Sequence, residues 1–129
     1  MTTLDNALLL LARLGLAFLF VVEGWEKIGS YAGVVDYMQQ YGVPGFLLPG
    51  AIAIELGGGL LVVLGLFTRW ASIVLAAFCV LTAVLFHGNI SDGDAFIQFG
   101  KDVSIAGGFL ALAVAGAGAW SVDALMRRR

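Results

Sequence analysis

The chain has 129 residues, of which 60% are hydrophobic and 12% charged, and its mean hydropathy is +0.97. Soluble domains carry about 25% charged residues, so this composition favours an integral membrane protein over a very apolar soluble bundle. The net charge of −2 without a basic stripe excludes a nucleic-acid-binding protein, and the single cysteine, Cys79, excludes a disulfide within the chain.

Four apolar segments are long enough to cross a bilayer, whose hydrocarbon core of about 30 Å requires roughly 20 helical residues. In chain order they cover approximately residues 6–28, 46–67, 70–86 and 101–120. Their length and their lack of alternating polarity exclude strands, and in lipid each segment must pair its own backbone groups, as a helix does. The sequence therefore predicts an all-α integral membrane protein, a four-transmembrane-helix bundle that forms one domain over residues 1–129.

A short amphipathic segment separates the first two predicted spans. At helical spacing, one face carries Tyr31, Val34, Val35, Met38 and Tyr41, and the opposite face carries Asp36, Gln39 and Gln40. Tyrosine favours the boundary between lipid and water, so we expect a short interfacial helix here, with a plain loop as the alternative.

The connections and the basic residues predict the orientation in the membrane. Thr68-Arg69 is a tight link between the second and third spans, whereas residues 88–100 are expected to form a polar loop. An even number of spans places both termini on one side, together with Arg69 and the tail Arg127–Arg129. The positive-inside rule puts this side in the cytoplasm and the interfacial helix on the outside.

Two ionisable residues are predicted to lie deep in the bilayer. A charge at the centre of a spanning helix costs about 2.5–3.5 kcal/mol on insertion scales, so it persists when it is paired or lines a polar cavity. With a rise of about 1.5 Å per residue, Arg13 and Glu55 differ in depth by about 7 Å, within the reach of an extended arginine. We expect Arg13 and Glu55 to form a buried polar pair, whose alternative role is to fix helix packing without chemistry.

A second group of ionisable residues collects at the outer ends of the predicted spans. It consists of Glu23, Glu26, Lys27, His87, Lys101 and Asp102. In a bundle of this topology the six side chains reach similar depth, so we expect them to line a shallow ligand pocket that opens outward above Glu55. The alternative is an ordinary belt of interfacial charges with extended lysines. One histidine and one cysteine at different depths form no ligand cluster, so no metal site is expected.

Several short motifs, in their order along the chain, resemble the DoxX family, in particular its small YqjF-like inner-membrane proteins. They are Arg13-Leu14-Gly15, Gly24-Trp25-Glu26-Lys27, Tyr41–Gly45, Glu55–Gly59, Gly65–Arg69, Phe86-His87, Lys101, Gly107-Gly108 and Gly116–Asp123. The resemblance implies a multi-pass protein of the bacterial inner membrane. It also implies an association with redox chemistry, because relatives are similar to the membrane subunit of a thiosulfate:quinone oxidoreductase or are linked to redox stress and quinone tolerance.

The function expected from the residues and the resemblance is that of a redox-associated accessory subunit that binds a quinone or another lipophilic aromatic molecule. In it Glu55 and His87 exchange protons with the ligand, Arg13 keeps Glu55 ionised, and Lys27 or Lys101 donates a hydrogen bond. No internal electron carrier is recognisable, so the chain is not a complete oxidoreductase and needs a soluble or membrane redox partner. The alternatives are a non-enzymatic structural or assembly subunit of an inner-membrane complex and a small exporter. The glycine faces also allow a homo-oligomer.

Overall fold

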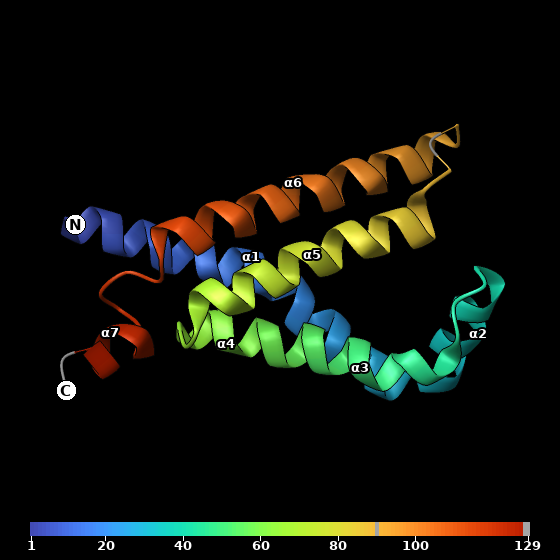
Figure 1. Cartoon of the computed structure of the whole chain (residues 1–129), viewed down its shortest axis with the longest axis horizontal. Helices are drawn as coiled ribbons and strands as arrows, with labels where there is room; N and C mark the ends of the chain where they lie inside the picture. The colour runs from blue at the N-terminus through green and yellow to red at the C-terminus, as the bar shows by residue number, and fades with distance from the viewer. Residues whose placement is uncertain (90, 128–129) are drawn as a thin grey trace.

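The computed structural model describes residues 1–89 and 91–127, and every element within these ranges is a helix (Figure 1). Four helical segments are long and apolar enough to cross a membrane: Thr3–Gly29, Gly45–Leu64, Thr68–His87 and Gly93–Ala115. The predicted all-α fold with four spans is confirmed. Both ends of the chain lie at one end of the bundle, which we call the terminal end (Figure 1). The opposite end carries helix α2 (Tyr31–Gln40) and is called the α2 end.

Helix α1 (Thr3–Gly29) is the first span. A capping box starts it, because the Thr2 hydroxyl accepts a hydrogen bond from the Asp5 amide at 3.1 Å and the Asp5 carboxylate accepts one from the Thr2 amide at 3.0 Å. The buried side of the helix carries Arg13, Ala17, Phe20 and Gly24. Spacings of three and four residues keep this side facing the other helices.

Helix α2 follows α1 directly, which confirms a short helix between the first two spans. Its Met38 is 6% exposed and packs with Val43 and Leu48, at the start of the second span. Between α2 and the second span the chain turns at Gly42, whose positive φ of 73° suits glycine. The position of α2 at the boundary between lipid and water stays a prediction.

The second span is irregular. It begins as η1 (Gly45–Leu47) and α3 (Leu48–Ile52), widens into one π-helical turn, η2 (Ala53–Gly57), and ends as α4 (Gly58–Leu64). Pro49 lies in the first turn of α3, where a missing backbone donor costs nothing. Helix α4 stops at Gly65, whose left-handed φ of 69° is a common ending for a helix.

Helices α5 (Thr68–His87) and α6 (Gly93–Ala115) form an antiparallel hairpin (Figure 1). The predicted loop over residues 88–100 and the predicted span over 101–120 are therefore wrong in their bounds. The Asp92 carboxylate caps α6 by accepting from the Asp94 amide at 3.0 Å, so the polar residues that follow form the first turns of a helix. Gly116, with φ of 79°, ends the helix earlier than its apolar sequence indicated.

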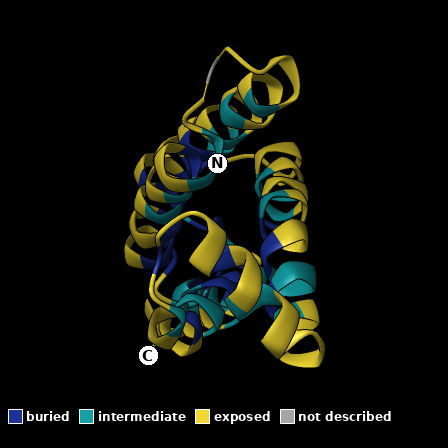
Figure 2. Ribbon diagram, turned by 90° about the vertical axis from the view of Figure 1, so that its right-hand side faces the viewer, coloured by how far each residue is buried: buried dark blue, intermediate teal, exposed yellow. Residues whose placement is uncertain are grey.

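The main core lies where α1, α4, α5 and α6 meet. The rings of Phe20 and Phe109 meet edge to face there, with centroids 5.5 Å apart. Gly24 and Gly59 let α1 approach the second span closely, since a Cβ on either would lie 2.9 Å from a side-chain atom of the other helix. Buried residues face the inside of the bundle and the outward faces are exposed, an arrangement suited to a surrounding of lipid (Figure 2).

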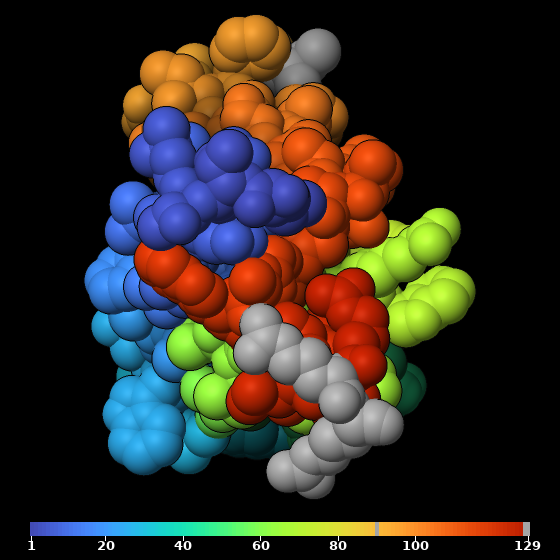
Figure 3. All heavy atoms as spheres, turned by 90° about the vertical axis from the view of Figure 1, so that its left-hand side faces the viewer, coloured from blue at the N-terminus to red at the C-terminus, as the bar shows by residue number. Residues whose placement is uncertain are grey.

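After α6 the chain crosses the terminal end beside the first residues of α1 and continues into helix α7 (Val122–Arg127), which lies next to the turn between α4 and α5 (Figure 3). Side-chain oxygens of two residues help to hold this C-terminal segment. The Asn6 side-chain oxygen accepts from the Ala119 amide at 3.0 Å, and the Asp123 carboxylate accepts from the amides of Phe67 and Thr68 at 2.8 and 3.0 Å. The segment therefore links the start of α1 to the turn between α4 and α5.

Candidate functional site

A cavity of about 720 Å³ lies at the α2 end of the bundle. Residues of α1, α2, the second span, α5 and α6 line it, and most of its wall is apolar. Sites for small molecules usually have volumes of about 300–1,000 Å³ and combine apolar walls with a few polar groups. The cavity therefore has the size and character of a small-molecule site.

All six residues predicted to line an outer pocket are found in the wall of this cavity, together with Glu55. Helix α1 contributes Glu23, Glu26 and Lys27, α5 contributes His87 at its last residue, and α6 contributes Lys101 and Asp102. They meet because α6 begins at Gly93, which places Lys101 and Asp102 two turns inside the helix, opposite the end of α5.

Glu55 is the most deeply buried charged residue of the cavity, with 2% of its surface exposed. The Lys27 ammonium group donates to both of its carboxylate oxygens at 2.8 Å. Lys27 also lies 3.8 Å from Glu23, one helical turn away on α1. The pair Lys27–Glu55 thus connects the end of the first span to the middle of the second.

The predicted pair of Arg13 and Glu55 is wrong, although both residues are buried, at 1% and 2% exposure. Arg13 donates instead to three backbone carbonyls, those of Ala117 at 2.8 Å, Trp120 at 3.0 Å and Val63 at 3.1 Å. Val63 is eight residues beyond Glu55 along the second span, a rise of about 12 Å. Arg13 therefore lies level with the terminal end, out of reach of Glu55 and outside the cavity lining.

Glu55 lies on the π-helical turn η2, where the second span is wider than a regular α-helix. Such single turns occur frequently at functional sites, because the extra residue changes the direction of nearby side chains. Gly24 of α1 lies directly against Leu56, the residue after Glu55. This close approach brings the two backbones together next to the Lys27–Glu55 pair.

His87 and Asp102 form a second polar contact in the cavity wall. The His87 Nε2 atom lies 3.9 Å from the Asp102 carboxylate, and the two side chains are 28% and 24% exposed. The contact joins the end of α5 to α6, across the hairpin. The imidazole is thus held near a carboxylate, in a position where it can exchange protons with water or with a molecule in the cavity.

Three aromatic rings form a cluster at the α2 end of the cavity, and the sequence did not single them out as a group. Tyr37 stacks on Phe86 with centroids 5.5 Å apart, Tyr41 meets the same ring at 5.3 Å, and the two tyrosines lie 5.0 Å apart. Tyr37 and Phe86 also line the cavity. The spacing of the tyrosines by four residues predicts that they share a face, but their contact with α5 depends on the tertiary fold.

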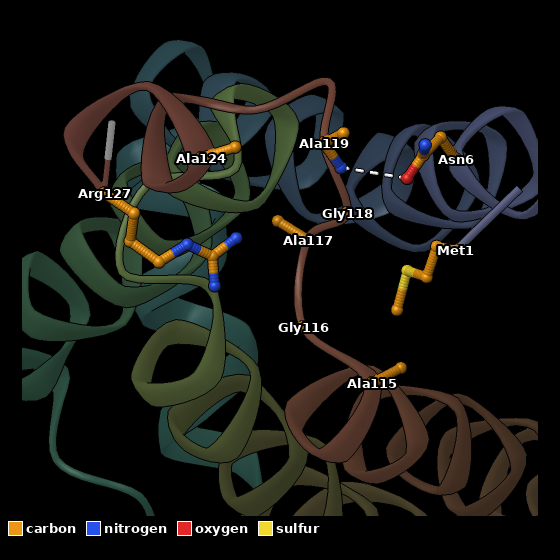
Figure 4. Close-up of a pocket in the computed structure, with 9 residues that line it drawn as sticks. All are labelled: Met1, Asn6, Ala115, Gly116, Ala117, Gly118, Ala119, Ala124 and Arg127. Atoms are coloured by element: carbon orange, nitrogen blue, oxygen red, sulfur yellow. Dashed lines mark hydrogen bonds between the residues drawn. The ribbon is translucent and has the colours of Figure 1, made fainter. Parts of the chain in front are cut away.

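A second, smaller cavity of about 370 Å³ lies at the terminal end (Figure 4). Figure 4 shows Arg127 pointing toward the centre of this space, with Met1 and Asn6 on the opposite side. The remaining lining consists of Ala115, Gly116, Ala117, Gly118, Ala119 and Ala124. None of the predicted site residues borders it, so the cavity beside Glu55 is the better candidate.

Comparison with known proteins agrees with this architecture. Residues 8–88 match the model of the DoxX family. The chain is 44% identical to inner membrane protein YqjF of Escherichia coli K12, over 100% of this chain and 99% of the relative, and 40% identical to inner membrane protein YphA of the same organism, over 90% and 88%. It is also 36% identical to the protein named "Putative oxidoreductase CatD" of Bacillus subtilis 168, over 52% of this chain and 50% of that one.

No solved structure matches the chain. The family model covers more than half of the residues, and the match to YqjF extends from end to end. The four apolar helices agree with the membrane location in the names of the two Escherichia coli relatives. The chain therefore belongs to the DoxX family, as an integral membrane protein.

Proposed function

We propose that this protein binds a quinone or a similar lipophilic aromatic molecule in the 720 Å³ cavity, as the membrane subunit of a redox system. The observation that carries the proposal is the Lys27–Glu55 ion pair in the wall of a largely apolar cavity. Ionisable residues at membrane depth are expensive and mark functional sites, and apolar walls with few polar groups are typical of ligand pockets.

The residues of the cavity fit the chemistry of a quinone, a planar ring that accepts two electrons and two protons on reduction. Glu55 and His87 are the groups of this chain that would exchange protons with the ring oxygens. Lys27 takes the role expected of Arg13, since it stabilises the ionised form of Glu55. Lys101 lines the cavity and has no carboxylate within 4 Å among the described residues, so it is free to donate to a ligand oxygen.

Electrons for such a reaction would come from a separate protein, because no electron carrier is recognisable in the sequence. The similarity to CatD, a protein named as an oxidoreductase, supports a place in a redox system, over about half of the chain. We therefore infer an accessory subunit that holds the lipophilic molecule while a soluble or membrane partner reduces or oxidises it.

The same proposal includes an orientation. Arg69 and Arg127 lie at the terminal end of the bundle, and basic residues accumulate on the cytoplasmic side of inner-membrane proteins. Both termini would then be cytoplasmic, and the cavity with its charged rim would face the outside of the bacterial inner membrane. A ligand would enter from the outer leaflet or from the periplasm.

A direct test is to purify the protein in a mild non-ionic detergent and identify co-purified quinone by solvent extraction and mass spectrometry. We expect quinone with the wild type and less with Glu55→Gln, which keeps an acceptor but removes the charge paired with Lys27. Asp36→Asn is the matched control, because Asp36 is an exposed carboxylate at the same end and outside the cavity lining. In cells, Glu55→Gln should lower tolerance of menadione while Asp36→Asn leaves it unchanged.

A structural or assembly role is the second candidate, and one observation favours it. The Lys27–Glu55 pair and the Arg13 contacts each join different helices, as residues that only fix packing would do. The double variant Lys27→Met with Glu55→Met separates the two roles, since it removes both charges together. If this variant folds and keeps full menadione tolerance and partner association, the structural role is supported and ligand binding through the pair is contradicted.

A further inference from the structure

The charges around the 720 Å³ cavity do not balance. Its lining contains the carboxylates of Glu23, Glu26, Glu55 and Asp102 and the ammonium groups of Lys27 and Lys101. Four acids against two lysines leave a surplus of two negative charges when His87 is neutral. The surplus lies at the exposed rim of the cavity, with Glu23 and Glu26, so it acts at short range on a charged molecule that enters.

Two carboxylates of this lining, Glu23 and Glu26, remain available to a ligand. Both short contacts of Lys27, at 2.8 Å, go to Glu55, and Glu23 has only a longer contact with the same ammonium, at 3.8 Å. The Glu23 side chain is 45% exposed, which leaves its oxygens accessible. Asp102 is less available to a ligand, because His87 lies beside its carboxylate, at 3.9 Å.

Glu23 also lies deeper in the first span than Glu26. It precedes Lys27 by one turn of α1, about 6 Å nearer to the middle of the span. Glu26 lies closer to the end of the helix and is exposed, where water screens its charge. A positive group beside Glu23 would therefore be attracted more strongly than one beside Glu26.

We infer that the cavity prefers an aromatic molecule that carries a positively charged nitrogen to one that carries an anionic group, and that Glu23 determines this preference. The inference rests on the proposed binding of lipophilic aromatic molecules and states which charge on such a molecule the cavity favours over the other. The apolar body of such a cation would pack on the wall formed by Phe78, Phe86 and Ile54, and aromatic rings near the charge add a cation–π contribution. A lipophilic anion would meet the surplus of carboxylates and be disfavoured.

Three probes with one ring system and different charges test the inference: 2-naphthylmethylammonium, 2-naphthalenemethanol and 2-naphthoate. Binding is measured by isothermal titration calorimetry with the full-length protein in a neutral detergent, with protein-free micelles as the blank. Cavity occupancy is checked by competition, because a probe that is bound in this one cavity must be displaced by either of the other two.

We expect the cation to bind at least about tenfold more tightly than the anion, because the cation makes a favourable contact with Glu23 where the anion is repelled. The affinity of the neutral probe should lie between the two. Glu23→Gln should lower this ratio several-fold, and the exposed carboxylate variant Asp36→Asn should leave it unchanged. Binding without a preference for the cation, or a ratio that survives Glu23→Gln, would overturn the inference while leaving the proposed function intact. If none of the three probes binds, the proposed aromatic-binding function fails as well.

Discussion

Lys27 places its ammonium nitrogen 2.8 Å from both carboxylate oxygens of Glu55, across the contact between the first and second spans. Both residues line the cavity, and their side chains are 24% and 3% exposed, so the carboxylate is almost completely buried beneath the lysine. A buried carboxylate that loses its partner keeps its desolvation cost without compensation. This geometry makes the pair sensitive to the loss of either member.

Lys27→Met is therefore expected to lower the free energy of unfolding by about 2–4 kcal/mol, because Glu55 is left buried without a cation. The double variant Lys27→Met with Glu55→Met should recover most of this loss, since two apolar side chains can pack in place of the pair. Circular dichroism during unfolding in detergent measures the stability of the single and the double variant. Lys101→Met is the control, because Lys101 lines the same cavity without an ion pair among the described residues. An equal loss from Lys101→Met would contradict a specific role of the pair.

Arg13→Met should destabilise the terminal end of the bundle by roughly 2–4 kcal/mol, since three carbonyls of the C-terminal segment and the second span lose their donor. Arg13→Lys should recover only part of the loss, because a lysine lacks the planar fork that reaches separate acceptors. The measurement is again unfolding in detergent. Arg69→Met changes an exposed arginine and serves as the control.

The comparison of Arg13 with Glu55 shows what the sequence can and cannot predict here. Hydropathy and length were enough to predict four helices, and burial of both charges followed from the cost of placing them in lipid. The partner of Arg13 was not predictable in this way. Two of its three acceptors are backbone carbonyls of a segment that leaves the helix at Gly116, a break that apolar composition does not reveal.

The residues of the candidate pocket were easier to predict from the sequence than the partner of Arg13. Charges near the ends of helices with known direction must come to similar depth, and this placed the six predicted lining residues together. Sequence alone gave the wrong partner for Glu55, because side-chain reach was allowed for Arg13 but not for Lys27, whose side chain extends inward from the end of its helix. The aromatic contact of Tyr37 with Phe86 depends on how α2 folds back, which no local pattern determines.

Gly24→Ala should weaken the contact between α1 and the second span by about 1–3 kcal/mol. A Cβ at this position would lie 2.9 Å from both the Cβ and the backbone nitrogen of Leu56, so a backbone must move. The same substitution at Gly15, on the same helix, is the control, because a Cβ there meets no atom within 4 Å. Thermal unfolding of the two variants should show a lower midpoint for Gly24→Ala alone. Equal midpoints would show that this close approach does not contribute to stability.

Asp123 provides a pH-dependent contribution at the terminal end. Burial raises the pKa of its carboxyl, but hydrogen bonds from the amides of Thr68 and Phe67 outweigh burial and bring the pKa below its usual value. Phe67 has a left-handed φ of 50°, uncommon for a residue with a side chain, so the carboxylate also holds a strained turn in place.

A lowered pKa in the folded state means that ionised Asp123 stabilises the fold above the pKa of the unfolded chain, about 3.9, and that this contribution disappears as the pH falls through the lower folded value. Wild type should therefore be more stable than Asp123→Asn at neutral pH, by about 1 kcal/mol, because the NH2 group of Asn cannot accept the second of the two amide hydrogen bonds. The difference should shrink below about pH 4. Thermal unfolding of both proteins between about pH 7 and pH 3 measures this difference. A gap between wild type and variant that is constant across the range would show that the amide contacts do not depend on the charge of Asp123.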